Sequence, residues 1–169
     1  MNVLGKILRW IDTFTQWQAY ILAPLCVTLV GMVIFDIVAR QFGMITDWGF
    51  DFEWFQYAFI LMAALGYAVL KDQHVRIDLM TTRYSPRVQA ALMAFSYAFF
   101  VIPLMILVAM TSWEWASWSK SIGEVTERPW YGPLWPIKFF IFIGIMLMLP
   151  QVLAQLTRNI VFVIKKVKL

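Results

Sequence analysis

Ionisable residues inside or beside long apolar segments are the candidates for chemistry in this 169-residue chain. Asp36 and Arg40 stand four residues apart in the stretch FDIVARQF, so a helix places both on one face, where they can form an ion pair. A carboxylate inside a membrane span is also a candidate for proton or ion coupling, because burying its charge costs about 2.5 to 3.5 kcal/mol on insertion scales. Asp36 therefore has two interpretations, a structural pair with Arg40 or the coupling carboxylate of a small proton-driven exporter with four spans.

Glu53 stands at the start of the next apolar segment, within FDFEWF. A carboxylate at this point favours the amino-terminal end of a helix, where the helix dipole is positive. Glu53 also has the charge to pair with Arg40, which would tie the first two apolar segments together. Both capping and interhelical pairing are open from the sequence.

His74 is the only histidine of the chain, and Cys26 is its only cysteine. A structural zinc site needs several Cys or His ligands, and a bis-histidine haem needs a second histidine. The serines have no base in the apolar segments to activate them as nucleophiles, and glycine-rich phosphate-binding motifs are missing. We therefore expect no enzymatic activity and no metal or cofactor in this chain, with His74 bonded to backbone or to lipid headgroups.

The composition indicates a bilayer as the environment of the chain. Hydrophobic residues make up 62% of the sequence and charged residues only 14%, which is more apolar surface than one small soluble core can bury. The net charge of +4 is scattered between apolar runs rather than gathered on one face. We interpret the basic residues as signals of membrane topology, and we expect no nucleic-acid partner.

Four apolar runs are long enough to cross a membrane, since about 20 residues at about 1.5 Å per residue span a hydrocarbon core of about 30 Å. The sequence predicts an all-α integral membrane protein of one domain, with transmembrane helices at about residues 18–39, 54–70, 88–113 and 134–156. Residues 1–17 carry apolar side chains at helical spacing, which predicts an amphipathic helix in the inner interface. Residues 157–169 form a basic cytoplasmic tail.

The distribution of Lys and Arg predicts the orientation of these spans. Ten basic residues fall on the side that holds both termini and the middle loop, and four fall on the other side. Because Lys and Arg accumulate on the cytoplasmic side of a membrane protein, both termini are predicted to be cytoplasmic. The connection before the fourth span, rich in Trp, Gly and Pro, is then the larger outer surface.

Two stretches resemble the small membrane subunit of tripartite ATP-independent periplasmic (TRAP) transporters, the DctQ type. KDQHVRIDLM follows the second span, and its core from His74 to Asp78 matches the family signature of His, a hydrophobic residue, Arg, a hydrophobic residue and Asp. GEVTERPWYGPLWPIKF leads into the fourth span, with Glu127-Arg128-Pro129-Trp130 in place of the commoner Leu-x-x-Pro-x-Trp. The resemblance covers nearly the whole chain.

The resemblance implies an accessory role. In that family a large membrane subunit carries the solute and the coupling sodium ions, and a soluble periplasmic binding protein delivers the solute. The small subunit would be a non-catalytic scaffold of a sodium-coupled importer of organic acids, paired with the large subunit in a bacterial or archaeal inner membrane. The candidate structural or interface residues are Asp36, Arg40, Glu53, His74, Arg76, Asp78, Glu127, Arg128 and Trp130. Arg76 and Asp78 would hold their turn or contact the large subunit.

Overall fold

The structure, a computed structural model, describes residues 3–44, 46–71, 84–127 and 131–165. Helices make up most of this part, and four of them are long and apolar enough to cross a membrane. One of the four, residues 86–121, combines α4, a π-helical turn (η1) and α5. The elements are α1 (Val3–Gln41), α2 (Asp47–Leu70), α4 (Pro86–Ser96), η1 (Tyr97–Val101), α5 (Ile102–Ser121) and α6 (Trp135–Lys165).

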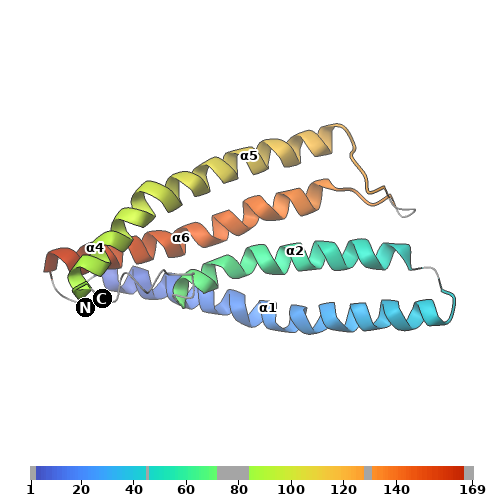
Figure 1. Ribbon diagram of the computed structural model, residues 1–169, viewed down its shortest axis with the longest axis horizontal. Helices are drawn as coiled ribbons and strands as arrows, with labels where there is room; N and C mark the ends of the chain where they lie inside the picture. The colour runs from blue at the N-terminus through green and yellow to red at the C-terminus, as the bar shows by residue number, and fades with distance from the viewer. Residues whose placement is uncertain (1–2, 45, 72–83, 128–130, 166–169) are drawn as a thin grey trace.

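The four long helices form a flattened row in the order α1, α2, α6, α5 (Figure 1). α2 and α6 are central, while α1 and α5 lie at the two edges. The start of α1 and the end of α6 lie at the same end of the row, which we name the inner end. The opposite end, where α1 meets α2 and α5 meets α6, is named the outer end. In a row, each edge helix has neighbouring helices on one side only, so much of its surface is left uncovered.

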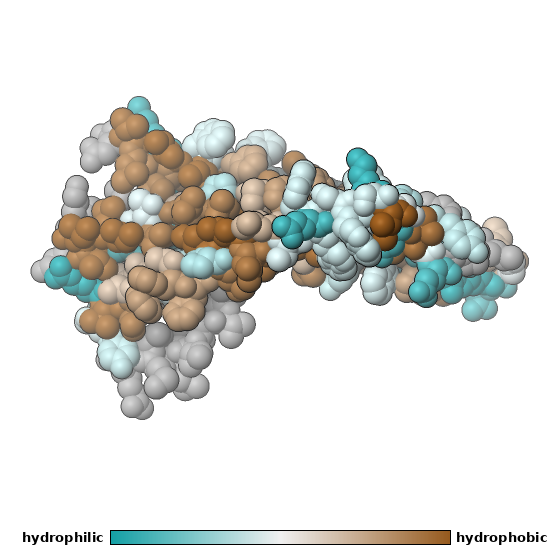
Figure 2. Space-filling model, turned by 90° about the horizontal axis from the view of Figure 1, so that it is seen from above, coloured by the Kyte–Doolittle hydropathy of each residue, from teal (hydrophilic) through white to brown (hydrophobic). Residues whose placement is uncertain are grey.

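The buried core is small and lies between α2, α5 and α6. Its fully packed members are Val69, Met105, Ala109, Ile145 and Val152. In the most apolar window of residues 86–121, only 6% of the residues are buried. Apolar side chains cover a broad area of the face in Figure 2, and more polar ones gather towards the outer end. Exposed apolar surface on this scale fits a chain whose solvent is lipid.

The amino-terminal segment differs from the separate interfacial helix that the sequence predicts. α1 runs without a break from Val3, through Pro24, to Gln41, about 58 Å at 1.5 Å per residue. Leu8 and Thr15 are buried on its inward side, whereas Val3 is exposed. The predicted division at residue 17 is thus not marked by a helix end, because no turn-forming residue interrupts the segment. The interfacial position of residues 1–17 stays a prediction.

Other helix ends also lie beyond the predicted apolar runs. α2 begins at Asp47, α5 continues to Ser121, and α6 continues to Lys165. Hydropathy identifies only the part of a helix that contacts hydrocarbon. The helical backbone hydrogen bonds can continue into the headgroup layers, where polar residues with good helix propensity replace apolar ones. The long outer connection expected from the sequence is therefore reduced to residues 122–134.

The π-helical turn η1 lies immediately before Pro103. Proline lacks a backbone N–H and its ring clashes with the carbonyl four residues earlier, at Phe99 within η1. Widening this turn accommodates Pro103 while the helix continues from α4 into α5.

Candidate functional site

Asp36 joins the outer ends of α1 and α2. Its carboxylate accepts a hydrogen bond from the hydroxyl of Thr46, the residue that directly precedes α2. The other carboxylate oxygen lies 2.7 Å from Arg40 Nη2, one turn further along α1. Asp36 is only 7% exposed. A buried carboxylate needs partners for its charge, and Thr46 and Arg40 are these partners. The predicted Asp36–Arg40 pair is present in the structure.

Glu53 lies in the second turn of α2 and is not bonded to Arg40. Its Oε1 atom is buried and accepts no hydrogen bond within the described part of the chain. Arg40 instead pairs with Asp36, and the described residues contain no ion pair between Arg40 and Glu53. Side-chain hydrogen bonds link the first two spans instead: Thr46 donates to Asp36, and the Gln56 amide of α2 donates to the Leu25 oxygen at 2.9 Å and to the Thr28 hydroxyl at 2.6 Å on α1.

A second polar cluster joins α1 to α6 near the inner end. Arg158 forms an ion pair with Asp12. The side-chain amide of Gln151 donates to Asp12 Oδ1 at 3.1 Å and accepts from the Thr15 hydroxyl at 3.1 Å. Gln151 is fully buried, so its amide needs both partners. We name these four residues the inner cluster.

The inner cluster was missed by sequence reasoning, although its spacing carried a signal. Asp12 and Thr15 are three residues apart on α1, and Gln151 and Arg158 are seven apart on α6, so each pair shares a helix face. Gln155, between them on α6, donates to the backbone oxygen of Val69 at 3.5 Å. The inner cluster therefore connects α6 to α1, and Gln155 beside it connects α6 to the end of α2.

Lys138 fixes the outer connection against the helices. Its ammonium forms an ion pair with Glu124 and lies 4.5 Å from the centre of the Trp115 ring. The hydrogen bond from the Lys138 ammonium holds the pKa of the Glu124 carboxyl below its ordinary value of 4.5. These contacts join α5, α6 and the segment between them.

Backbone hydrogen bonds close the outer connection into a compact hairpin. Val125 pairs with Pro133 in an antiparallel bridge, and the N–H of Thr126 donates to the Gly132 oxygen at 2.8 Å. The N–H of Leu134 donates to the Glu124 oxygen at 3.0 Å. Glu127, which follows Thr126 in this hairpin, is exposed.

Five of the predicted site residues lie outside the described residues. His74, Arg76 and Asp78 fall within residues 72–83, and Arg128 and Trp130 fall within residues 128–130. Their roles stay predictions.

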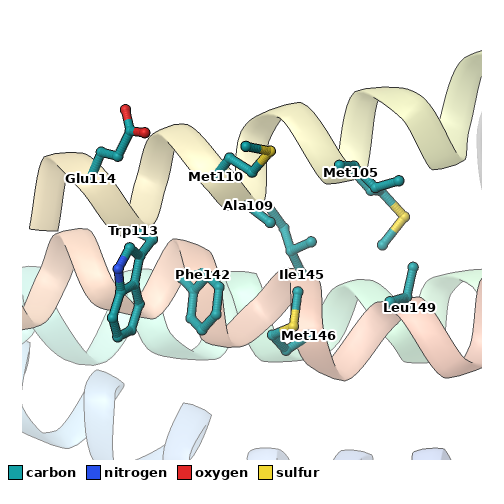
Figure 3. Close-up of a pocket in the computed structure, with 10 residues that line it drawn as sticks. Met105, Ala109, Met110, Trp113, Glu114, Phe142, Ile145, Met146 and Leu149 are labelled. Carbon is teal, nitrogen blue, oxygen red and sulfur yellow. The ribbon is translucent and has the colours of Figure 1, made fainter.

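Two apolar grooves run along the helix seams. The first, of about 520 Å³, lies between α5 and α6 (Figure 3) and is lined among others by Met105, Met110, Trp113, Phe142 and Met146. The second, of about 560 Å³, lies along α2 and α6 and is lined among others by Trp54, Tyr57, Leu61, Trp115 and Lys138. Within the described ranges, His, Cys, Asp and Glu form no group of three or more that suits a metal ion. The grooves are complementary to hydrocarbon or to apolar side chains.

A family model for the DctQ component of tripartite ATP-independent periplasmic transporters matches residues 29–162. No curated protein and no solved structure matches the chain at a significant level. The matched region takes in the last third of α1, all of α2, α4, η1 and α5, and nearly all of α6. The chain therefore belongs to the DctQ family and is the small membrane component of a TRAP transporter, a multi-pass membrane protein.

Proposed function

We propose that this small component is an accessory, non-catalytic scaffold subunit of a sodium-coupled importer of organic acids. A separate large membrane subunit would bind the solute and the sodium ions. The observation that carries the proposal is the edge position of α1, which has α2 as its main neighbour and leaves a long apolar side uncovered. Such a side is suited to pack against another membrane protein.

The uncovered side of α1 has the features of a helix-packing surface. Val27, Val30, Ile34 and Val38 follow one another at helical spacing, and each is at least 48% exposed. Gly31 lies within this stripe and has no atom within 4 Å of the position that a β-carbon would take. In lipid, where water exclusion gives no drive for association, an open glycine permits the close approach that favours helix pairing. We name this stripe the α1 edge.

Internal pairing of three charged side chains, those of Asp36, Asp12 and Lys138, supports the non-catalytic part of the proposal. Asp36 is bonded to Thr46 and Arg40, and Asp12 is bonded to Arg158 and Gln151. Lys138, the charged residue of the α2–α6 groove, is paired with Glu124. An organic anion or a sodium ion would have to displace these partners. Solute and ion binding are therefore assigned to the large subunit.

The outer hairpin is assigned to contact with a periplasmic binding protein. Backbone hydrogen bonds join its two sides, and the side chain of Glu127 is exposed on it. Reversing this charge with Glu127→Lys is expected to reduce uptake that depends on the binding protein, with an unchanged yield of the membrane complex. Unchanged uptake would remove the hairpin from the docking surface.

The membrane in question is proposed to be the inner membrane of a bacterium or archaeon, with the inner end of the row in the cytoplasm. The ratio of ten to four basic residues between the two sides supports this orientation. A reporter that is active only in the periplasm, fused after Leu169, is expected to be silent. Periplasmic activity of that fusion would reverse the orientation.

Cross-linking of the complex tests the scaffold proposal. Cys26, the only cysteine of the chain, is exposed on α1 beside the stripe. A photoactivatable thiol reagent on Cys26 is expected to capture the large subunit when the two are co-expressed. The matched control is a Cys26→Ser chain with Leu107→Cys on the opposite edge helix α5, where the side chain is also exposed. Equal capture from both positions, or none from Cys26, would contradict the assignment of the α1 edge.

A further inference from the structure

Tyr131 has a backbone conformation that is uncommon for its residue type. Its φ angle is +49°, in the left-handed region, and no other non-glycine residue in the described part of the chain has a positive φ. A β-carbon is crowded against the backbone in this region, so the conformation costs free energy for most residues, whereas glycine and asparagine adopt it readily. A tyrosine keeps this conformation only where the surrounding structure imposes it.

The hydrogen bonds of the outer hairpin impose the conformation of Tyr131. The carbonyl oxygen of the next residue, Gly132, accepts from the Thr126 N–H at 2.8 Å, and the Gly132 N–H donates to the Thr126 hydroxyl at 3.1 Å. Both of these partners are buried, and the antiparallel bridge between Val125 and Pro133 lies beside them. The direction in which the chain leaves Tyr131 is therefore set by contacts of its neighbours.

The side chain of Tyr131 is largely uncovered by the rest of the chain. It is 65% exposed, and within the described ranges it takes part in no hydrogen bond, ion pair or ring contact. Glycine or asparagine at this position is compatible with the same hairpin and has less backbone strain. A strained residue whose ring is exposed indicates a role in contacts with another molecule.

The position of Tyr131 identifies the kind of molecule that it meets. The connection between α5 and α6 extends past the start of α6 (Figure 1), and the bridge residue Pro133 separates Tyr131 from that helix. Trp118 and Trp135 lie at the outer ends of α5 and α6, and tryptophans at helix ends mark the headgroup layer. Tyr131 is therefore beyond the layer in which acyl chains and membrane helices pack, on the side that a soluble protein approaches.

Two aliphatic residues on the same connection are exposed as well. Ile122 and Val125 are about half exposed, although more polar side chains gather towards this end of the molecule (Figure 2). Apolar side chains that are exposed to water beside an exposed aromatic ring are typical of protein–protein contact surfaces. Tyrosine is among the residues that contribute most to binding at such surfaces.

We propose that Tyr131 is the anchor residue that binds the periplasmic binding protein to the outer hairpin, a role that rests on the docking function proposed above. The ring enters an apolar pocket of the binding protein, and Ile122 and Val125 cover its surroundings. Because the hydrogen bonds at Gly132 already hold the backbone at Tyr131, little conformational freedom is lost on binding.

Uptake at increasing concentrations of the binding protein tests the anchor role. Proteoliposomes contain this chain and the large subunit, and the probe is the binding protein of the same transporter, purified with the organic acid that it carries. Tyr131→Asn removes the ring but suits a left-handed backbone. We expect it to raise the half-saturating concentration of binding protein about tenfold and to leave the maximum rate unchanged. Tyr131→Phe keeps the ring and is expected to stay within about twofold of the unmodified chain.

A stability measurement separates binding from a structural role of the ring. Because asparagine is less strained than tyrosine at a positive φ, Tyr131→Asn is expected to have an equal or higher unfolding midpoint in detergent. Tyr84→Asn is the matched control, since Tyr84 is an exposed tyrosine just before α4, at the inner end, and is expected to leave the half-saturating concentration unchanged. An unchanged half-saturating concentration for Tyr131→Asn would overturn the anchor role. A lower unfolding midpoint with a reduced maximum rate alone would assign the ring to folding or to lipid headgroups instead.

Glu127→Lys distinguishes failure of the anchor role from failure of the docking role. If Glu127→Lys reduces uptake and Tyr131→Asn has no effect, the hairpin contacts the binding protein and only the assignment of Tyr131 is wrong. If neither variant has an effect, the docking role of the hairpin is wrong, and the anchor role is wrong with it.

Discussion

Met62 of α2 and Gly144 of α6 cross at very short range. A β-carbon at Gly144 would lie 2.6 Å from the Met62 Cβ and 2.7 Å from the Met62 carbonyl oxygen, closer than real β-carbons approach other atoms. The two helices are the central pair of the row. The absence of a side chain at Gly144 thus sets the separation of α2 and α6, and through them the position of α1 and α5.

Replacing Gly144 with alanine is expected to destabilise the protein. The new methyl group meets backbone of α2 rather than a flexible side chain, so the helices must separate, at a cost of about 1 to 3 kcal/mol that exceeds the gain in helix propensity. Gly31→Ala on α1 is the matched control, because its β-carbon meets nothing within 4 Å. Thermal unfolding in detergent is expected to show a lower midpoint for Gly144→Ala and an equal or higher one for Gly31→Ala. An unchanged unfolding midpoint for Gly144→Ala would show that α2 and α6 are less closely packed at this crossing than the structure indicates.

The ion pair between Asp12 and Arg158 is expected to stabilise the contact of α1 with α6. Both side chains are about one-fifth exposed, so screening by solvent is limited. Asp12→Asn and Arg158→Gln are each expected to lower the unfolding midpoint, and a double-mutant cycle is expected to give a coupling energy of about 1 to 2 kcal/mol. Additive effects of the two changes would mean that the pair contributes nothing.

The four spans were predictable because hydropathy depends on residues that are close in sequence. Asp36 and Arg40 were predictable for the same reason, since one helical turn brings them together. Asp12 and Arg158 are 146 residues apart, and their pairing depends on α1 lying against α6. Helices coated with similar apolar side chains carry no sequence pattern that selects their neighbours, so the order of the row was not predictable.

Helix ends were harder to predict than helix existence. Trp115 and Ser119 lie in a polar stretch that hydropathy assigns to a loop, yet both belong to α5. Ser119 is buried in the structure. This burial accounts for the extension of α5 beyond the hydrocarbon layer. Tertiary contacts with Lys138 and Glu124 stabilise this extension, and such contacts are not visible in a local window.

The Glu124–Lys138 pair is expected to make stability depend on pH. Because the pKa of Glu124 is lowered in the folded protein, the pair contributes stability above the ordinary pKa of 4.5 and loses it as the pH falls through the folded value. Glu124→Gln is expected to lower the unfolding midpoint at neutral pH, and the difference from the unmodified chain is expected to shrink in acid. A difference that stays constant across the acidic range would contradict the role of this pair. Glu127→Gln is the control, since Glu127 lies in the same hairpin and is exposed.

Asp36→Asn distinguishes the scaffold role from a proton-coupled exporter. The amide retains an acceptor for the Thr46 hydroxyl and loses only the charge that faces Arg40. We expect the variant to support solute uptake in the complete transporter, with a modest fall in the yield of the complex. The measurement is uptake normalised to the amount of assembled complex. Complete loss of uptake at normal assembly would indicate that Asp36 takes part in coupling.

Reconstitution with one component omitted at a time tests the central claim most directly. Proteoliposomes would contain this chain, the large membrane subunit or both, with the periplasmic binding protein loaded with its organic acid outside and an inward sodium gradient. We expect uptake only when all three proteins and the gradient are present, and none from this chain alone. Robust flux of solute through liposomes that contain this chain alone would contradict the scaffold role.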